Sequence, residues 1–413
     1  MHRWLLLFVV MTAGELLAGT AAVLPFANRT TAARPSQTNM DWIGESIAET
    51  VRDALGARGV VTLSREEVEE AYRQLNLRPR GVLTAGSVLK IGEALDAEQV
   101  IYGTFEFSRE FSSEPGRDPS ASTGPQQGSL KISARIFDRR RLREGPEFIE
   151  TGSLEDVATL EAHLAWRTLS LLAPKLAPPE SEFRSLRSPV RLDAEESYVR
   201  GLLARAPEEQ EKFFLQAARL DSHYGHPAYQ LGRIHYARKE YRQAVEWLQK
   251  IAPDDVHYRE ASFLLGLALF QSSDFAGAQK AFQTVADSVP LGEVYNNLGA
   301  SQSRRNLPQA ADSFRKALDG DANDPLYHFN LGYALWKKGD FAAAADRFRA
   351  VLDRTPDDQM ATLMLGLSIK KQGPRQGDAR LETLERLKTN YEERAYWELK
   401  ALVEPSSPGP SKP

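Results

Sequence analysis

The chain has 413 residues, of which 42% are apolar, enough to bury more than one hydrophobic core. Its 52 basic and 56 acidic residues give a formal net charge of −4, so the composition argues against a general nucleic-acid-binding protein. The absence of cysteine excludes disulfides, thiolate metal sites, a cysteine nucleophile and a lipidated cysteine. The seven histidines include no HxxxH pair, and no phosphate-binding or hydrolase motif occurs in a suitable context. We therefore expect no enzyme activity, no cofactor and no small-molecule substrate.

The first 21 residues are predicted to be a secretory signal peptide. Arg3 precedes an apolar run at 4–13, and small residues at 19–21 could form a cleavage site. The run is about half the length of a membrane-spanning helix, so membrane contact would need an uncleaved N-terminus. This pattern predicts a periplasmic or otherwise exported protein. The alternative is a cytoplasmic protein whose first apolar residues form a strand.

Residues 22–176 are predicted to form an α/β sandwich built on a single sheet. Apolar runs of strand length alternate there with segments whose apolar residues share one helical face. Ser64 and Glu67 have the spacing of a capping box, and the Ser-, Gly- and Pro-rich stretch at 112–129 predicts a hairpin loop. In chain order we expect a strand at 21–28, a helix at 40–58, a strand at 60–64, a helix following Ser64, a helix at 83–95, strands at 98–108, 130–138 and 146–153, and a helix at 154–176.

The rest of the chain has a different composition. Residues 177–192 are rich in Pro, Ser and charge, which predicts a linker. From 193 to 402 the apolar pattern is helical throughout, which predicts an all-α domain. The Pro- and Ser-rich tail at 403–413 is predicted to be disordered.

A repeat of about 34 residues is the strongest signal in the sequence. Leu-Gly pairs place glycines at 232, 266, 299, 332 and 366, with spacings of 34, 33, 33 and 34 residues. Small residues and then large apolar residues follow at fixed distances, as in Ala278 and Phe282. This pattern resembles the tetratricopeptide (TPR) repeat family over about 195–402, with five repeats and a degenerate sixth before them. The resemblance implies helix pairs that stack into a right-handed superhelix.

The resemblance also implies a binding groove lined by the first helix of each repeat. An extended peptide or a helix with apolar anchors and an acidic flank would match its aromatic and cationic side chains. The family's carboxylate-clamp pattern is not met at Tyr229 and Arg233, which argues against a chaperone C-terminus as ligand. An alternative is that some of these residues pack against neighbouring repeats. The candidate groove residues are Tyr229, Arg233, Tyr236, Phe263, Phe270, Asn296, Arg304, Phe329, Tyr333, Trp336, Lys337 and Lys370.

Residues 381–403 are predicted to form a helix that caps the last repeat. Leu384, Leu387, Tyr391, Trp397 and Leu402 are spaced so that they would share one face of that helix. A terminal repeat needs such a cap because its apolar face would otherwise contact water.

The region 22–174 resembles the amino-terminal domain of periplasmic TolB. The segments that carry the resemblance are V-L-P-F-x-N at 23–28 and A-x-x-V-I-x-G-T at 97–104. The curli-secretion, flagellar-outer-membrane and penicillin-binding-protein-activator lipoproteins share this domain. Asn28 and Gly103 are its most motif-like residues, and we expect them to serve a turn and a close backbone approach. The resemblance implies a binding domain rather than a catalyst.

Together these features predict a non-catalytic adaptor of the bacterial cell envelope. Protein partners would bind to the TPR groove, with the N-terminal domain as a second contact surface. The alternative is a cytosolic regulatory TPR protein that works with a separate signalling enzyme. The balanced charge predicts no nucleic-acid partner in either case.

Overall fold

The computed structural model describes residues 20–30, 40–109, 128–185, 190–374 and 380–397. The chain divides into two compact units, residues 1–192 with 397–413 and residues 193–396. Residues 1–19 of the predicted signal peptide, most of the hairpin loop at 112–129 and the tail at 403–413 lie outside the described residues, whereas Ala21, the last residue of the predicted signal peptide, is buried in the first strand. Among the described helices, none combines the length and hydropathy that crossing a bilayer requires.

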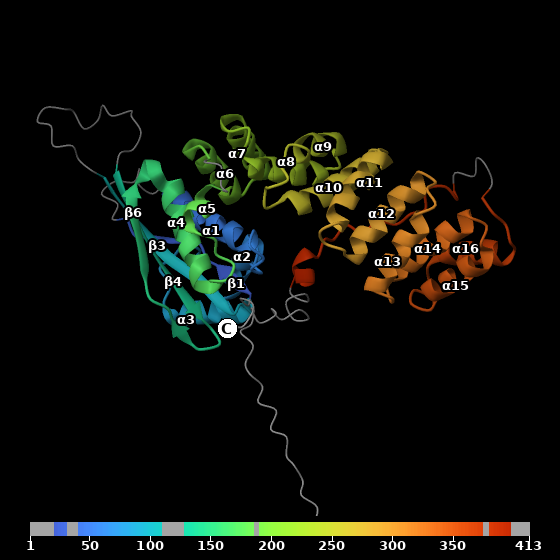
Figure 1. The fold of residues 1–413 in the computed structure, drawn as a ribbon, viewed down its shortest axis with the longest axis horizontal. Coiled ribbons are helices and arrows are strands. Elements are labelled where there is room, and N and C mark those ends of the chain that lie inside the picture. The colour runs from blue at the N-terminus through green and yellow to red at the C-terminus, as the bar shows by residue number, and fades with distance from the viewer. Residues whose placement is uncertain (1–19, 31–39, 110–127, 186–189, 375–379, 398–413) are drawn as a thin grey trace, which may run out of the picture. The chain divides into compact units, whose positions relative to one another are not determined.

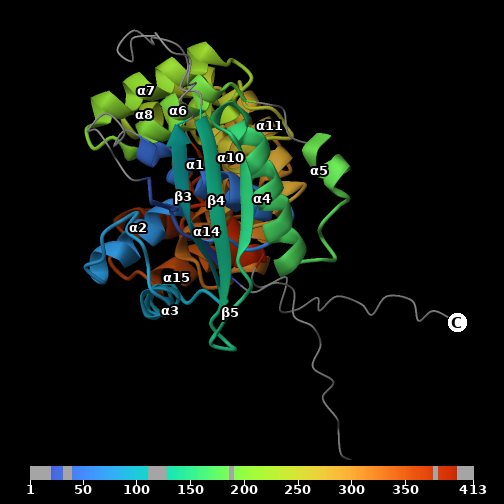
Figure 2. The same cartoon turned by 90° about the vertical axis from the view of Figure 1, so that its left-hand side faces the viewer.

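The first unit contains a mixed sheet whose described part has six strands. The two long strands, β3 and β4, are antiparallel neighbours along their whole length, with Gln99 opposite Asp138 (Figure 2). Strands β1 and β2 lie parallel to β3, and β5 and β6 lie antiparallel to β4. The strands are β1 (Ala21–Val23), β2 (Ala27–Asn28), β3 (Gln99–Arg109), β4 (Gly128–Asp138), β5 (Arg143–Glu144) and β6 (Phe148–Ser153).

Two of the predicted strands differ from the structure. The expected strand at 21–28 is divided after Val23, and the Phe26 amide donates to the Gly44 carbonyl of a neighbouring helix instead of extending the ladder. Proline at position 25 lacks the N–H that a continuous strand would need. The expected strand at 60–64 is wrong, because this segment makes a single bridge, between Thr62 and Ala21. It lies beside a strand of only three residues, which offers few pairing positions.

Helices cover both faces of the sheet. On one face Tyr72 of α2 and Ile91 of α3 pack with Val100 and Tyr102 of β3 in one buried cluster. On the other face Gly44 of α1 lies against Phe105 of β3. The predicted capping box is present, since the Ser64 hydroxyl accepts from the Glu67 amide and the Glu67 carboxylate accepts from the Ser64 amide. The helices of this unit are α1 (Asp41–Gly56), α2 (Arg65–Gln74), α3 (Ala85–Ala94), α4 (Val157–Leu172) and α5 (Glu180–Ser185).

Helix α5 lies within the region 177–192 that the sequence predicts to be a linker. Beyond it, the regular elements in the described part of the second unit are all α-helices, most of them arranged in consecutive antiparallel pairs (Figure 1). The pairs are α6 (Leu192–Leu203) with α7 (Pro207–Leu220), α8 (Gly225–Ala237) with α9 (Tyr241–Leu248), α10 (Tyr258–Gln271) with α11 (Phe275–Ala286), α12 (Gly292–Arg304) with α13 (Ala310–Gly320), and α14 (Pro325–Lys337) with α15 (Phe341–Leu352); α16 (Gln359–Ile369) follows.

The repeated glycines allow the two helices of a pair to approach closely. A Cβ built on Gly299 would lie 2.8 Å from the Phe314 ring of the partner helix, and one on Gly266 would lie 2.7 Å from Phe282. Gly366 of α16 is different, because no described atom lies within 4 Å of its built Cβ. In the described part of the chain, α16 is therefore not followed by a second repeat helix.

The predicted capping helix at 381–403 is wrong for residues 381–392, and residues 398–403 lie outside the described residues. Residues 381–392 form no helix, and Thr383 has a left-handed backbone conformation with φ of 65°. A helical segment begins only at residue 393. The path taken by residues 381–392 decides what the inner surface of the solenoid can bind.

Candidate functional site: the inner face of the solenoid

Residues 381–393, here called the C-terminal segment, lie along the first helices of three consecutive repeats. We call the surface of α10, α12 and α14 that they contact, with the first residues of α16, the inner face (Figure 1). Leu381, Leu384, Leu387 and Tyr391 pack against the buried apolar cluster of the solenoid. The segment runs antiparallel to the order of the repeats, from α14 at Leu381 to α10 at Tyr391.

Asparagine side chains hold the main chain of the segment. Asn330 accepts from the Arg386 amide at 2.9 Å and donates to the Arg386 carbonyl at 2.7 Å. Asn297 does the same for Lys388, at 2.8 and 2.7 Å. Asn296 donates to the Arg386 carbonyl and accepts from Asn330. Arg386 and Lys388 are two residues apart. In a β-strand, residues with this spacing point their amide and carbonyl groups to the same side. The asparagine side chains therefore take the place of a neighbouring strand.

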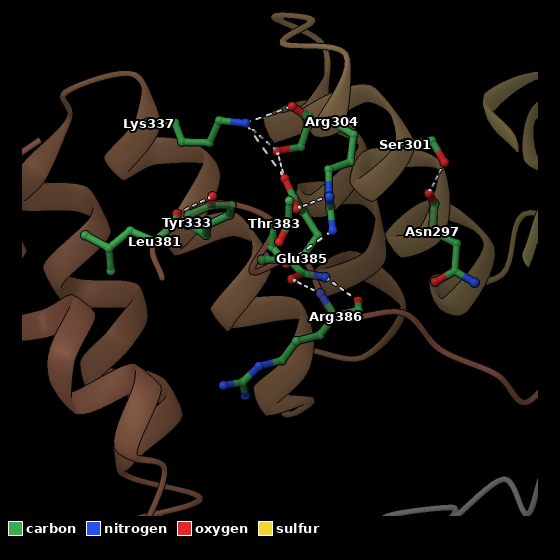
Figure 3. Close-up of polar contacts among 11 residues, drawn as sticks. Asn297, Ser301, Arg304, Tyr333, Lys337, Leu381, Thr383, Glu385 and Arg386 are labelled. Carbon is green, nitrogen blue, oxygen red and sulfur yellow. Dashed lines mark hydrogen bonds and ion pairs between the residues drawn. The ribbon is translucent and has the colours of Figure 1, made fainter. Parts of the chain in front are cut away.

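The Glu385 side chain enters a polar pocket between α12 and α14 (Figure 3). Its carboxylate is fully buried, accepts from the Ser303 hydroxyl at 2.6 Å and forms an ion pair with Arg304 at 2.6 Å. Lys337 lies 3.8 Å from the same carboxylate and donates to the Ser303 carbonyl at 2.8 Å. Burial lowers the pKa of Lys337, and the Glu385 charge opposes that effect. A buried carboxylate is stable only with such partners.

The next two charged side chains of the segment meet carboxylates. Arg386 forms two parallel contacts with Asp358, at 2.6 and 3.0 Å, and its guanidinium lies 3.5 Å from the centre of the Phe329 ring. Lys388 forms an ion pair with Asp324. The hydrogen bond from Arg386 holds the pKa of Asp358 below its usual range. Both aspartates are also the N-cap residues of α16 and α14.

The far end of the segment is held by an aromatic contact and one further main-chain bond. The Tyr391 ring stacks on Phe263 of α10, with centroids 4.9 Å apart. The Glu392 amide donates to the Glu293 carboxylate of α12 at 3.0 Å. Main-chain contacts therefore continue to the end of the segment.

Half of the predicted groove residues contact the C-terminal segment: Phe263, Asn296, Arg304, Phe329, Tyr333 and Lys337. Among the others, Trp336 is fully buried and donates to the Gln372 carbonyl, and Phe270 lies beneath the Arg304 guanidinium. Tyr229 stacks on His257 at 4.4 Å and lies beneath Arg233, Tyr236 packs on Tyr241, and Lys370 is exposed at the end of α16.

The sequence interpretation found Asn296 but missed Asn297, Asn330 and the acidic side of the inner face. Asn297 and Asn330 stand directly before the Leu-Gly pairs of two adjacent repeats, 33 residues apart, so the repeat alignment itself could have identified them. Asp358 caps α16, and the same carboxylate also binds Arg386. An N-cap aspartate whose carboxylate also binds a ligand side chain cannot be distinguished in the sequence from an ordinary N-cap aspartate.

Comparisons with known proteins agree with the repeat pattern. Residues 263–325 and 329–395 match the family model of the tetratricopeptide repeat. The helix pairs within these residues, α10 with α11, α12 with α13 and α14 with α15, match TPR repeats. The second match includes the whole C-terminal segment, although that segment forms no repeat helix in the structure. Repeat proteins of this kind use the extended concave surfaces of their solenoids for binding.

Solved structures of TPR proteins are among the similar folds. A MamA double mutant is 25% identical, with 41% of this chain and 100% of that chain covered and a TM-score of 0.37. MamA from Desulfovibrio magneticus RS-1 is 23% identical over 41% of this chain and 99% of its own, also with a TM-score of 0.37. YrrB, described as a TPR protein with an unusual peptide-binding site, is 18% identical over 46% of this chain and 91% of its own, with a TM-score of 0.34. No curated protein matched significantly.

Acidification should release the C-terminal segment. Because Arg386 lowers the pKa of Asp358, the contact stabilises the docked segment above the ordinary aspartate pKa and is lost as the pH falls through the lowered value. We expect docking to weaken below about pH 4. Limited proteolysis by an acid protease between pH 5 and 2.5 would measure this weakening of docking. As the pH is lowered, cleavage within 381–393 should increase before the helices are cleaved. In Asp358→Asn, which keeps the helix cap, cleavage should already be high at pH 5. A pH profile identical to that of the unchanged chain would contradict the assignment.

Proposed function

We propose that the inner face of the solenoid binds an extended segment of a partner protein, and that the protein is a non-catalytic scaffold. The observation that carries this proposal is the set of asparagine side chains that hold both main-chain groups of Arg386 and of Lys388. Bonds to the main chain do not depend on the ligand's side chains, so they supply affinity for an extended chain. The C-terminal segment then serves as an internal example of the ligand.

The chemistry of the inner face supports binding rather than catalysis. Its charged groups are engaged in holding a peptide: Arg304 and Lys337 by the Glu385 carboxylate, and Asp358 by Arg386. The apolar contacts of Tyr391 and the leucines supply the anchors that peptide interfaces commonly use.

The test uses a full-length chain with an open inner face. In this open-face variant, residues 381–393 are replaced by a Gly- and Ser-containing sequence of the same length. A labelled peptide of residues 380–394 should bind it saturably in a fluorescence anisotropy titration. Adding Asn330→Ala should weaken binding about tenfold or more, because two hydrogen bonds are lost. Lys280→Ala, a change of an exposed side chain on α11, should leave the affinity unchanged. If the correctly folded open-face variant does not bind the peptide, the proposal fails.

We also propose that this scaffold works in the bacterial cell envelope, with the N-terminal domain as a second contact surface. The proposal rests on the signal-like residues 1–21 and on the resemblance of 22–174 to the TolB domain, both of which stay predictions. Alkaline phosphatase fused after residue 30 should be active in a bacterial host, and the same fusion without residues 2–19 should be inactive. An inactive full fusion would favour the cytosolic regulatory alternative.

A further inference from the structure

We propose that the inner face selects partners by a charge order, and that the C-terminal segment competes with them. The preferred ligand is an extended peptide with a glutamate at the place of Glu385, an arginine directly after it and a lysine two residues further on. This inference rests on the proposed function and specifies its ligand. It commits to a protein segment of this chemistry as the occupant that displaces residues 381–393.

The Glu385 pocket is the main specificity element. Its three partners, Ser303, Arg304 and Lys337, all belong to repeat helices, so the pocket remains when the segment leaves. The carboxylate that fills it has no exposed surface. A neutral or basic side chain there would leave two cations partly buried without an anion. Desolvated cations of this kind reject the wrong ligand strongly.

The two basic residues of the ligand are bound by equivalent residues of successive repeats. Arg386 is held by Asn330 and the N-cap Asp358, and Lys388 by Asn297 and the N-cap Asp324. Each repeat nearer the N-terminus of the solenoid therefore binds a ligand residue two positions further along the ligand. In each case one asparagine binds the main chain and the N-cap aspartate of the following repeat binds the side chain. The register of the ligand is fixed by this pairing.

Competition follows from covalent attachment. Eleven residues, 370–380, connect α16 to the segment, so it is presented to the inner face at an effective concentration on the order of millimolar. For a peptide with a Kd on the order of 10 μM, such an internal competitor weakens binding about 100-fold. A partner must therefore bind more tightly than the segment itself, or bind when the segment is released.

The experiment measures three peptides against two forms of the full-length chain. The peptides are residues 380–394, the same peptide with Glu385→Gln, and a matched control with Glu382→Gln, whose side chain is exposed in the docked segment. The proteins are the unchanged chain and the open-face variant. On the open-face variant, Glu385→Gln should weaken binding tenfold or more and Glu382→Gln less than twofold. The unchanged chain should bind the parent peptide about 100-fold more weakly than the open-face variant does.

The outcomes separate the two proposals. Equal binding of the Glu382→Gln and Glu385→Gln peptides would overturn the charge-order selection. Equal affinity of both proteins for the parent peptide would overturn the competition. No binding of any peptide to the open-face variant would instead remove the proposed function itself. Should the open-face variant fail to fold, Glu385→Lys in the full chain replaces it, because a cation beside Arg304 and Lys337 should expel the segment with a single substitution.

Discussion

Gly103→Ala is expected to destabilise the N-terminal sheet domain strongly. A Cβ built on Gly103 would lie 2.1 Å from the Ser133 carbonyl oxygen of β4 and 2.4 Å from the Phe26 ring. The oxygen belongs to the main chain of the neighbouring strand, so it cannot move without breaking the β3–β4 ladder. Overpacking of this kind costs about 3 kcal/mol or more. For a domain of this size the thermal midpoint should fall by roughly 10 °C.

Gly152→Ala is the matched control for this prediction. Gly152 lies in β6 of the same sheet, and a Cβ built there would meet only the Leu160 side chain, at 3.0 Å. The leucine can change rotamer, and alanine is a better strand residue than glycine, so the midpoint should change little. Calorimetry of the full chain measures both variants, with amide exchange of β3 as the local probe. A midpoint for Gly103→Ala within 2 °C of the control would show that the sheet tolerates the methyl group.

Gly103 and Asn28 are also the residues that contribute most to the resemblance of residues 22–174 to the TolB domain. The two most motif-like residues there have structural roles: Gly103 permits close strand packing, and Asn28 accepts from the Thr30 amide and donates to Asp41. Both roles were predicted from the sequence, because a glycine inside a strand commonly marks a close backbone approach and an asparagine after a strand commonly marks a turn. Neither residue adds a binding site to the domain.

The solenoid was predictable because its packing has to repeat. Gly299 against Phe314 and Gly266 against Phe282 are the same contact one repeat apart, so the sequence pattern carries the three-dimensional one. Helix starts were predictable where local chemistry decides them, as at Ser64. The strand expected at 60–64 failed because pairing depends on a partner strand, here β1, whose length the local sequence does not determine.

The C-terminal segment was not predictable from its own residues. Leu381, Leu384 and Leu387 recur every three residues, a spacing that suits a helix face but also one side of an extended chain with threefold twist. The choice between them is made by side chains about 90 residues earlier in the chain, such as Asn297. Interactions of that sequence separation are invisible to periodicity. The composition of the inner face was therefore only partly predicted: its aromatic and cationic residues and Asn296 were found, and Asn297, Asn330 and the aspartates were not.

The combined change Asn297→Ala and Asn330→Ala is expected to release the C-terminal segment while the helices stay folded. It removes four hydrogen bonds to the main chain of Arg386 and Lys388. At about 0.5–1.5 kcal/mol for each bond, docking should lose about 2–6 kcal/mol. The Arg386 and Lys388 amides should then exchange with solvent roughly 30-fold faster or more, as measured by hydrogen exchange. The helices should be little affected, because these side chains bond to the segment and to Asn296 rather than to helix backbone.

Asn323→Ala is the control, since it makes the same substitution at an exposed turn of the same solenoid. It should leave the exchange of the Arg386 and Lys388 amides unchanged. If the double variant instead accelerates exchange throughout α12 and α14, the asparagines hold the helices together and the inner face is not built to bind a chain. If exchange accelerates at residues 386–388 alone, the side-chain amides act as the neighbouring strand of a bound peptide. The same two substitutions should then abolish binding of the peptide of residues 380–394 to the open-face variant, because docking in cis and binding in trans use the same four bonds.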